Sequence, residues 1–184
     1  MKLGKTYFYI IGGLTLFIYI ILVMSGKNAL QAFTGALSLS FVIYTLVWFL
    51  FDKWFWKRHV ILSLCGIENF SGKWSGTLHS SYGSGVEKKT KVDISQTFSR
   101  IVITTKTDEI ESVSFLAKWE KSMINKKKEI FYMYRTDPKG EHNDKNPVQY
   151  GAARIRFDDE QKTRLRIEYW TNRETVGYML LNKV

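Results

Sequence analysis

The sequence contains very little cysteine and histidine. Cys65 is the one cysteine among 184 residues, so no disulfide can form within the chain and a reducing compartment is expected. The three histidines, His59, His79 and His142, stand far apart, and neither an HxxH nor a CxxC pair occurs. Because zinc sites need clustered ligands of these types, the sequence predicts no metal ion and no cofactor.

Signatures of catalysis are also missing. The chain has no GxSxG nucleophile elbow, no GxxxxGK[ST] phosphate loop and no GxGxxG ahead of a helix. Asp158 and Asp159 are adjacent acids, but they lie in a break between predicted strands and are interpreted as a solvated turn. The sequence therefore favours a binding protein over an enzyme.

Charge is absent from two long apolar runs, Thr6 to Met24 and Ala29 to Phe51. A helix needs about 20 apolar residues to cross the roughly 30 Å core of a bilayer, and each run supplies that length. Only Ser25 to Asn28 separates them, so we predict a transmembrane helical hairpin. A signal peptide is the alternative for the first run, but no small-x-small cleavage site follows and a second run comes at once.

The net charge of +10 is concentrated partly beside the hairpin, which argues against DNA or RNA as its partner. Lys2 and Lys5 precede the hairpin and three further cations follow it, whereas its loop has Lys27 alone. By the positive-inside rule, both termini are predicted to be cytoplasmic. Tryptophan and cations after the second run predict a membrane interface made of Lys53, Trp54, Trp56, Lys57 and Arg58.

From Phe70 onward the apolar pattern has a period of two, which is typical of strands. Eight such segments follow one another with mostly short breaks, as expected of antiparallel hairpins. Closing them into an up-and-down barrel leaves no exposed edge; an open sandwich is the alternative. We therefore predict a mixed fold, with a transmembrane α-helical hairpin at 1–59, a linker at 60–69 and an all-β eight-stranded antiparallel barrel at 70–184. The segments are 70–82, 92–96, 100–106, 111–120, 129–135, 152–157, 164–170 and 175–181.

In such a barrel, every second connection between strands lies at the same end. The connections at one end, which join the first strand to the second, the third to the fourth, the fifth to the sixth and the seventh to the eighth, are rich in aromatic, hydroxyl, amide and guanidinium groups. Such groups stack on bases and bind phosphates, so this end is a candidate nucleotide site. Inward apolar residues such as Trp74, Ile103 and Tyr132 are expected to fill most of the lumen, which would keep a charged ligand at the mouth.

Seven motifs occur in an order that resembles a known family. They are FSGKWSGTLHSSY (70–82), VDISQT (92–97), SVSF (112–115), FYMYRTDP (131–138), YGAARIRF (150–157), YWTNR (169–173) and VGYMLL (176–181). Together with the hairpin, they are similar to the two-transmembrane β-barrel effectors of bacterial CBASS anti-phage defence. The resemblance covers the whole chain.

The resemblance implies a receptor for a cyclic dinucleotide or related cyclic oligonucleotide made by a CD-NTase. The barrel would bind this messenger, and the hairpin would then oligomerise and disrupt the bacterial inner membrane. Carried over by motif, the ligand-binding residues would be Tyr169, Thr171, Asn172 and Arg173, followed by Ser80, Tyr82, Ser112 and Arg135.

Two other functions remain open from the residues alone. A membrane-anchored lipid carrier of the lipocalin type would need an apolar rim, whereas the predicted mouth is rich in Ser, Thr, Asn and Arg. A scaffold subunit would use its hairpin to bind other membrane proteins. Co-purification of a nucleotide or a lipid would separate these readings.

Overall fold

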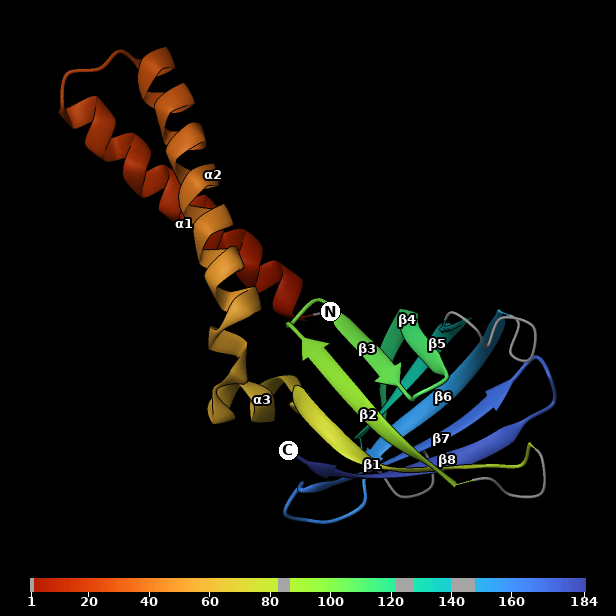
Figure 1. Cartoon of the computed structure of the whole chain (residues 1–184). Coiled ribbons are helices and arrows are strands. Elements are labelled where there is room, and N and C mark those ends of the chain that lie inside the picture. Colours follow the sequence, from red (N-terminus) through yellow and green to blue (C-terminus); the bar gives the residue numbers. More distant parts are fainter. Residues whose placement is uncertain (1, 83–86, 122–127, 140–147) are drawn as a thin grey trace. The chain divides into compact units, whose positions relative to one another are not determined.

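The computed structural model describes residues 2–82, 87–121, 128–139 and 148–184. By internal contacts the chain forms two compact units, one running to Phe55 and the other from Trp56 to Val184. The first is helical, and the second consists mainly of strands (Figure 1). Each unit is described by itself.

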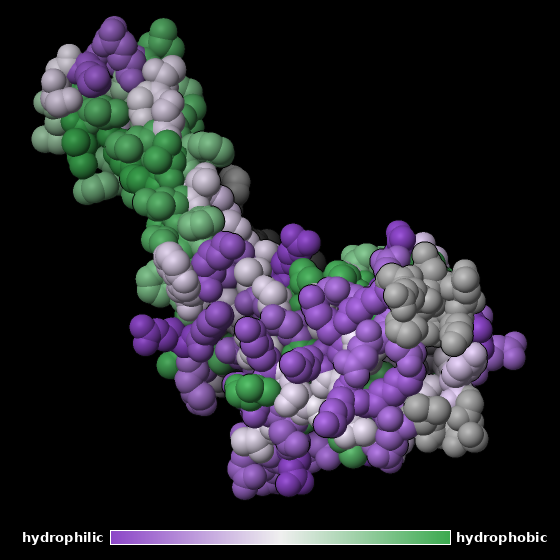
Figure 2. Space-filling view, viewed as in Figure 1, coloured by the Kyte–Doolittle hydropathy of each residue, from purple (hydrophilic) through white to green (hydrophobic). Residues whose placement is uncertain are grey.

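The helical unit is a pair of helices, α1 (Lys2–Met24) and α2 (Ala29–Lys53). The Asn28 side chain caps α2 by accepting a hydrogen bond of 2.9 Å from the Gln31 N–H. Ala32, Ala36 and Ser40, four residues apart, form the buried side of α2, while many larger apolar side chains point outward (Figure 2). By length and composition α2 qualifies as a membrane span, and Ile10–Met24 is a shorter apolar helix.

A short helical segment leads to the barrel. It comprises the 3-10 turn η1 (Phe55–Lys57) and α3 (His59–Cys65). Gly66 ends α3 in the left-handed region, with φ of 66°, and its N–H donates to two carbonyls of the last turn. Of the predicted interface residues, Trp54 is exposed whereas Trp56 is buried.

The second unit contains a closed barrel, as the period of two predicts. Every pairing is antiparallel, each strand pairs with the next, and the last pairs with the first (Figure 1). The strands are β1 (Gly72–Ser80), β2 (Glu87–Gln96), β3 (Ile101–Lys106), β4 (Ile110–Lys121), β5 (Lys128–Pro138), β6 (Gln149–Phe157), β7 (Arg164–Thr171) and β8 (Val176–Lys183).

Inward apolar side chains fill the half of the barrel that the chain enters from α3. Phe70 stacks on Phe157 with ring centroids 4.2 Å apart, and the Trp74 indole N–H donates to the Phe70 carbonyl over 3.1 Å. The Gln96 amide closes this end by bonding the Phe70 N–H and the Glu68 carbonyl. The inward residues expected to fill the lumen are confirmed as core, namely Trp74, Leu78, Ile94, Ile103, Tyr132, Ile155, Leu165 and Ile167, with Phe157 partly buried against them.

Candidate functional site: a polar cavity in the barrel

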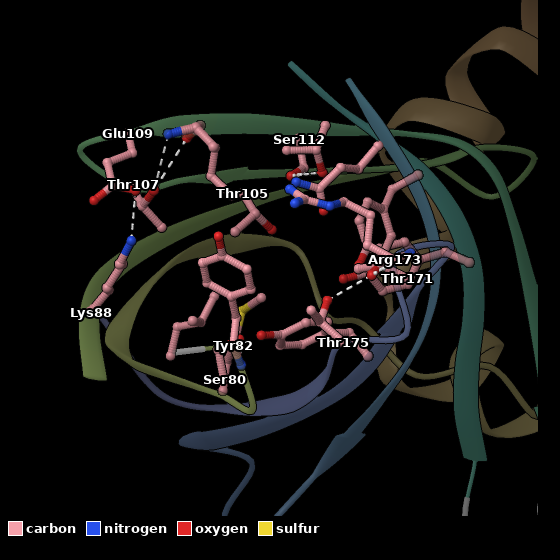
Figure 3. Close-up of a pocket in the computed structure, with 18 residues that line it drawn as sticks. Ser80, Tyr82, Lys88, Thr105, Thr107, Glu109, Ser112, Thr171, Arg173 and Thr175 are labelled. Carbon is pink, nitrogen blue, oxygen red and sulfur yellow. Dashed lines mark hydrogen bonds and ion pairs between the residues drawn. The ribbon is translucent and has the colours of Figure 1, made fainter. Parts of the chain in front are cut away.

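The opposite half of the barrel is hollow, so the inward apolar side chains fill less of the lumen than the sequence predicted. A cavity of about 600 Å³ opens there, within the range of small-molecule sites. Each of the eight strands contributes a side chain to its lining, and the β1–β2, β3–β4 and β7–β8 connections add more (Figure 3). The site therefore exists only when the whole barrel has closed.

Tyrosine rings form much of the deeper wall. Tyr132, Tyr134 and Tyr169 alternate with outward residues on β5 and β7, so their rings enter the lumen. Burial raises the pKa of each of the three hydroxyls above its ordinary value, in part opposed at Tyr132 by a hydrogen bond with Thr105 and at Tyr169 by one with Ser80. All three phenols are therefore neutral at physiological pH and add no negative charge to the cavity.

Two glycines make room for these rings. A Cβ added at Gly151 would lie 2.4 Å from the Tyr134 hydroxyl oxygen, and one at Gly177 would lie 2.6 Å from that of Tyr169. At Gly177 the Cβ would also lie 2.1 Å from the His79 carbonyl oxygen. Backbone atoms also border both positions, and backbone cannot move aside as a flexible side chain does. A larger residue at either position would therefore displace the neighbouring tyrosine ring, and glycine leaves the space that the ring occupies.

Paired hydroxyl groups line the wall of the cavity closer to its mouth. Ser112 and Thr136 hydrogen-bond each other over 2.8 Å between β4 and β5, and Thr171 and Thr175 do so over 2.6 Å across the β7–β8 turn. A hydroxyl both donates and accepts, so these groups can turn to match ring nitrogens, exocyclic groups or ribose hydroxyls.

Three charged residues occur among the described lining residues (Figure 3). Lys88 of β2 pairs with Glu109, with 2.6 Å between the ammonium nitrogen and a carboxylate oxygen. Arg173, in the β7–β8 turn, holds its guanidinium carbon 5.6 Å from the centre of the Tyr82 ring. The two cations can bind an anionic group, and the Arg173–Tyr82 contact orients one of them.

Six of the eight predicted ligand residues line the cavity: Ser80, Tyr82, Ser112, Tyr169, Thr171 and Arg173. Asn172 is used otherwise, since its side-chain oxygen accepts a 3.1 Å bond from the Tyr150 N–H and so ties the β7–β8 turn to β6. Arg135 is exposed on the outer wall and pairs with Asp137 over 2.8 Å. The cavity lining thus leaves out Arg135 of the motif FYMYRTDP and Asn172 of the motif YWTNR.

Lys88, Thr107, Glu109 and Gln149 line the cavity but were not predicted from the sequence. Lys88 shares its face of β2 with Thr90 and Val92, so continuing the period of two backwards identifies it. The apolar signal ended at Val92 because the inward side chains become polar where the strand reaches the cavity. The prediction therefore missed the first part of this strand, since β2 begins at Glu87, five residues before the predicted segment.

The arrangement is suited to binding. It offers aromatic faces, hydroxyl groups that accept and donate, and two cations, which together match the bases, riboses and phosphates of a nucleotide. Among the described residues, no three His, Cys, Asp or Glu side chains are grouped as metal ligands would be; His142 lies outside those residues.

Comparison with known proteins identifies the family of this chain. Residues 66–183 match the model of the family described as Cap15, cyclic dinucleotide receptor domain. The CD-NTase-associated protein 15 of Staphylococcus schleiferi is 29% identical over 178 residues, which cover 95% of this chain and 94% of that protein. The protein of the same name from Escherichia albertii is 25% identical over 161 residues, covering 83% and 82%. With the family model spanning the entire barrel, this chain belongs to the Cap15 family of CBASS effectors.

Proposed function

We propose that the barrel cavity binds a cyclic dinucleotide, or a related cyclic oligonucleotide, supplied by a CD-NTase. The observation that carries this proposal is the lining itself: neutral tyrosines deep in the barrel, paired hydroxyls closer to the mouth, and Lys88 and Arg173 nearer the solvent. A dianionic ligand loses least solvation when its phosphates stay near water and meet cations there.

Each part of such a ligand has a complement. Phosphate oxygens accept hydrogen bonds from Arg173 and Lys88, the latter shared with Glu109. Bases pack against Tyr82 and Tyr169, and their edges meet the Thr171–Thr175 and Ser112–Thr136 hydroxyl pairs. Apolar side chains at the floor, among them Leu78 and Met179, limit how deeply the ring enters.

We also propose how the helical unit responds. Both α1 and α2 cross the bacterial inner membrane, with the termini and the barrel in the cytoplasm, and Lys53, Trp54, Lys57 and Arg58 lie near the headgroups. Ligand binding leads to homo-oligomerisation of the hairpin and disruption of the membrane. Ala32, Ala36 and Ser40 of α2 are buried within the hairpin, so contacts between hairpins use small residues that stay exposed, such as Gly12 and Gly13 of α1 and Ser38 of α2.

Calorimetric titration of the full-length protein in detergent tests ligand binding. The probes are 3′,3′-linked cyclic dinucleotides containing each of the four RNA bases in turn, with linear dinucleotides as controls. Saturable binding of a cyclic probe, and none of its linear counterpart, supports the proposal. Absence of binding to every cyclic probe, together with a co-purified lipid in the barrel, would establish the lipid-carrier alternative instead.

A further inference from the structure

An apolar band crosses the outer wall of the barrel. Four register pairs align its members on neighbouring strands: Leu116 with Met133, Met133 with Ala152, Ala152 with Trp170, and Trp170 with Val176. The larger side chains of this row are 40–60% exposed, with values of 57% for Leu116, 45% for Met133, 46% for Trp170 and 55% for Val176. The row runs over β4 to β8, which are consecutive in the barrel (Figure 1).

A β-bulge in β4 enlarges the band. The register shifts between Ser114 and Leu116, so Phe115 is an extra residue opposite β5. As a result Phe115 and Leu116 are both exposed, at 60% and 57%, although strict alternation would turn one of them inward. The apolar band is therefore Phe115, Leu116, Met133, Ala152, Trp170 and Val176. Contiguous exposed apolar groups of this kind mark interaction surfaces.

The borders of the apolar band carry both signs of charge. On one side Arg135 pairs with Asp137 over 2.8 Å, and both side chains are 53% exposed. On the other side Glu168 is shared by Arg154, by Arg156 over 2.9 Å and by Arg166 over 3.0 Å, so each of these cations has an acidic neighbour. An anionic bilayer attracts cations that have no neighbouring acid. Paired charges instead suit a protein surface that offers the same pairs in reverse, as a second copy related by a twofold axis does.

The band also connects to the cavity. Trp170 and Val176 pair at the two ends of the β7–β8 turn, directly beside Thr171 and Thr175. Those threonines line the cavity and hydrogen-bond each other over 2.6 Å. A ligand that orders this turn therefore acts on the strand ends that carry the band.

We propose that the apolar band is the surface through which the barrels of two copies of this chain associate when ligand is bound. This rests on the proposed function, and it names the contact in the barrel that accompanies oligomerisation of the hairpin. Six partly exposed side chains offer on the order of a few hundred Å², less than the roughly 800 Å² per partner of a standard stable interface. The contact is accordingly weak in solution and becomes effective when anchored copies are at high local concentration.

Cysteine crosslinking of the full-length protein in liposomes tests the band. In a Cys65→Ser background, Met133→Cys places a thiol at its centre, and Asp93→Cys places one on the exposed face of β2 as a control. With the tightest-binding cyclic dinucleotide bound, we expect Met133→Cys to form crosslinked dimers at least five times faster than the control, and more slowly when the dinucleotide is left out. Leu116→Glu should reduce that rate to the control level with ligand affinity unchanged, whereas Ser95→Glu on β2 should not.

The outcomes separate the two proposals. Equal crosslinking of Met133→Cys and Asp93→Cys in ligand-bound protein overturns the band as a contact between copies, and a band that faces lipid gives this same result. Unchanged crosslinking in Leu116→Glu, with the variant folded by its melting curve, also overturns it. If no cyclic dinucleotide binds but Met133→Cys still crosslinks selectively, the ligand proposal fails while the contact stands.

Discussion

Replacing Arg173 with Ala removes the guanidinium held over Tyr82 and should weaken ligand binding without unfolding the barrel. The side chain is exposed, and its residue contributes to the turn through a backbone N–H that donates to Thr171 over 3.2 Å. Alanine retains that N–H, so the melting temperature should stay within about 2 °C, because surface changes alter stability by at most about 0.5 kcal/mol.

The loss in affinity follows from one charge-assisted phosphate contact. Such a hydrogen bond contributes about 1.5–3 kcal/mol, which corresponds to a roughly 10- to 150-fold rise in Kd. Calorimetric titration of Arg173→Ala with the best-binding cyclic dinucleotide measures it. Arg100→Ala, an exposed arginine in the β2–β3 connection, is the matched control and should bind as the unaltered protein does. A Kd within twofold of the original, or an equal loss in the control, would refute the assignment of Arg173 to the phosphate.

Three further changes test other parts of the structure. Gly177→Ala should lower stability by about 1–3 kcal/mol, seen in thermal melting, because its Cβ meets the His79 carbonyl oxygen; a melt unchanged from that of the parent protein would show that the strands can separate. Tyr169→Phe should raise Kd by roughly 2- to 10-fold by removing one neutral hydroxyl while keeping the ring, and a larger loss would assign the hydroxyl a charged partner. Burial alone would raise the pKa of Glu168, but its hydrogen bond with Arg154 and the neighbouring arginines lower it overall. Ionised Glu168 therefore contributes its full stabilisation above the ordinary glutamate pKa, and this contribution is lost as the pH falls through the lower pKa of the folded state. We expect Glu168→Gln to melt at a lower temperature than the parent protein at pH 7 and to lose less stability than the parent on acidification. A parallel loss in both proteins would contradict this.

The strand pattern was strong where one face of a strand is apolar. Trp74, Ile94 and Ile167 alternate with polar residues, so both the strands and their inward faces could be predicted. The pattern failed at the start of β2, where Lys88 and Thr90 face inward, because a polar cavity reverses the usual relation between burial and hydrophobicity. Cavity-lining strand ends are thus the least visible part of a barrel in its sequence.

The candidate site was only partly predictable, since neighbours in the chain alternate between the two sides of a barrel wall. The motif YWTNR contains Tyr169, Thr171 and Arg173, which line the cavity, and also Trp170, which belongs to the apolar band outside. Motif matching alone assigned Asn172 to the ligand, whereas its side chain holds Tyr150 of β6. A motif thus identifies a segment, but the side of the wall depends on register and turn geometry.

By itself, the sequence determined the apolar helical region, the eight strands and their order, because hydrophobic periodicity and chain length leave few other ways to bury these side chains. Only the tertiary structure decided that Lys88 of β2, Glu109 of the β3–β4 connection and Arg173 of the β7–β8 turn line one cavity. The bulge that exposes Phe115 beside Leu116 was also decided there. Both depend on how distant strands pair when the barrel closes, and pairing register is a property of the closed sheet that no single segment encodes.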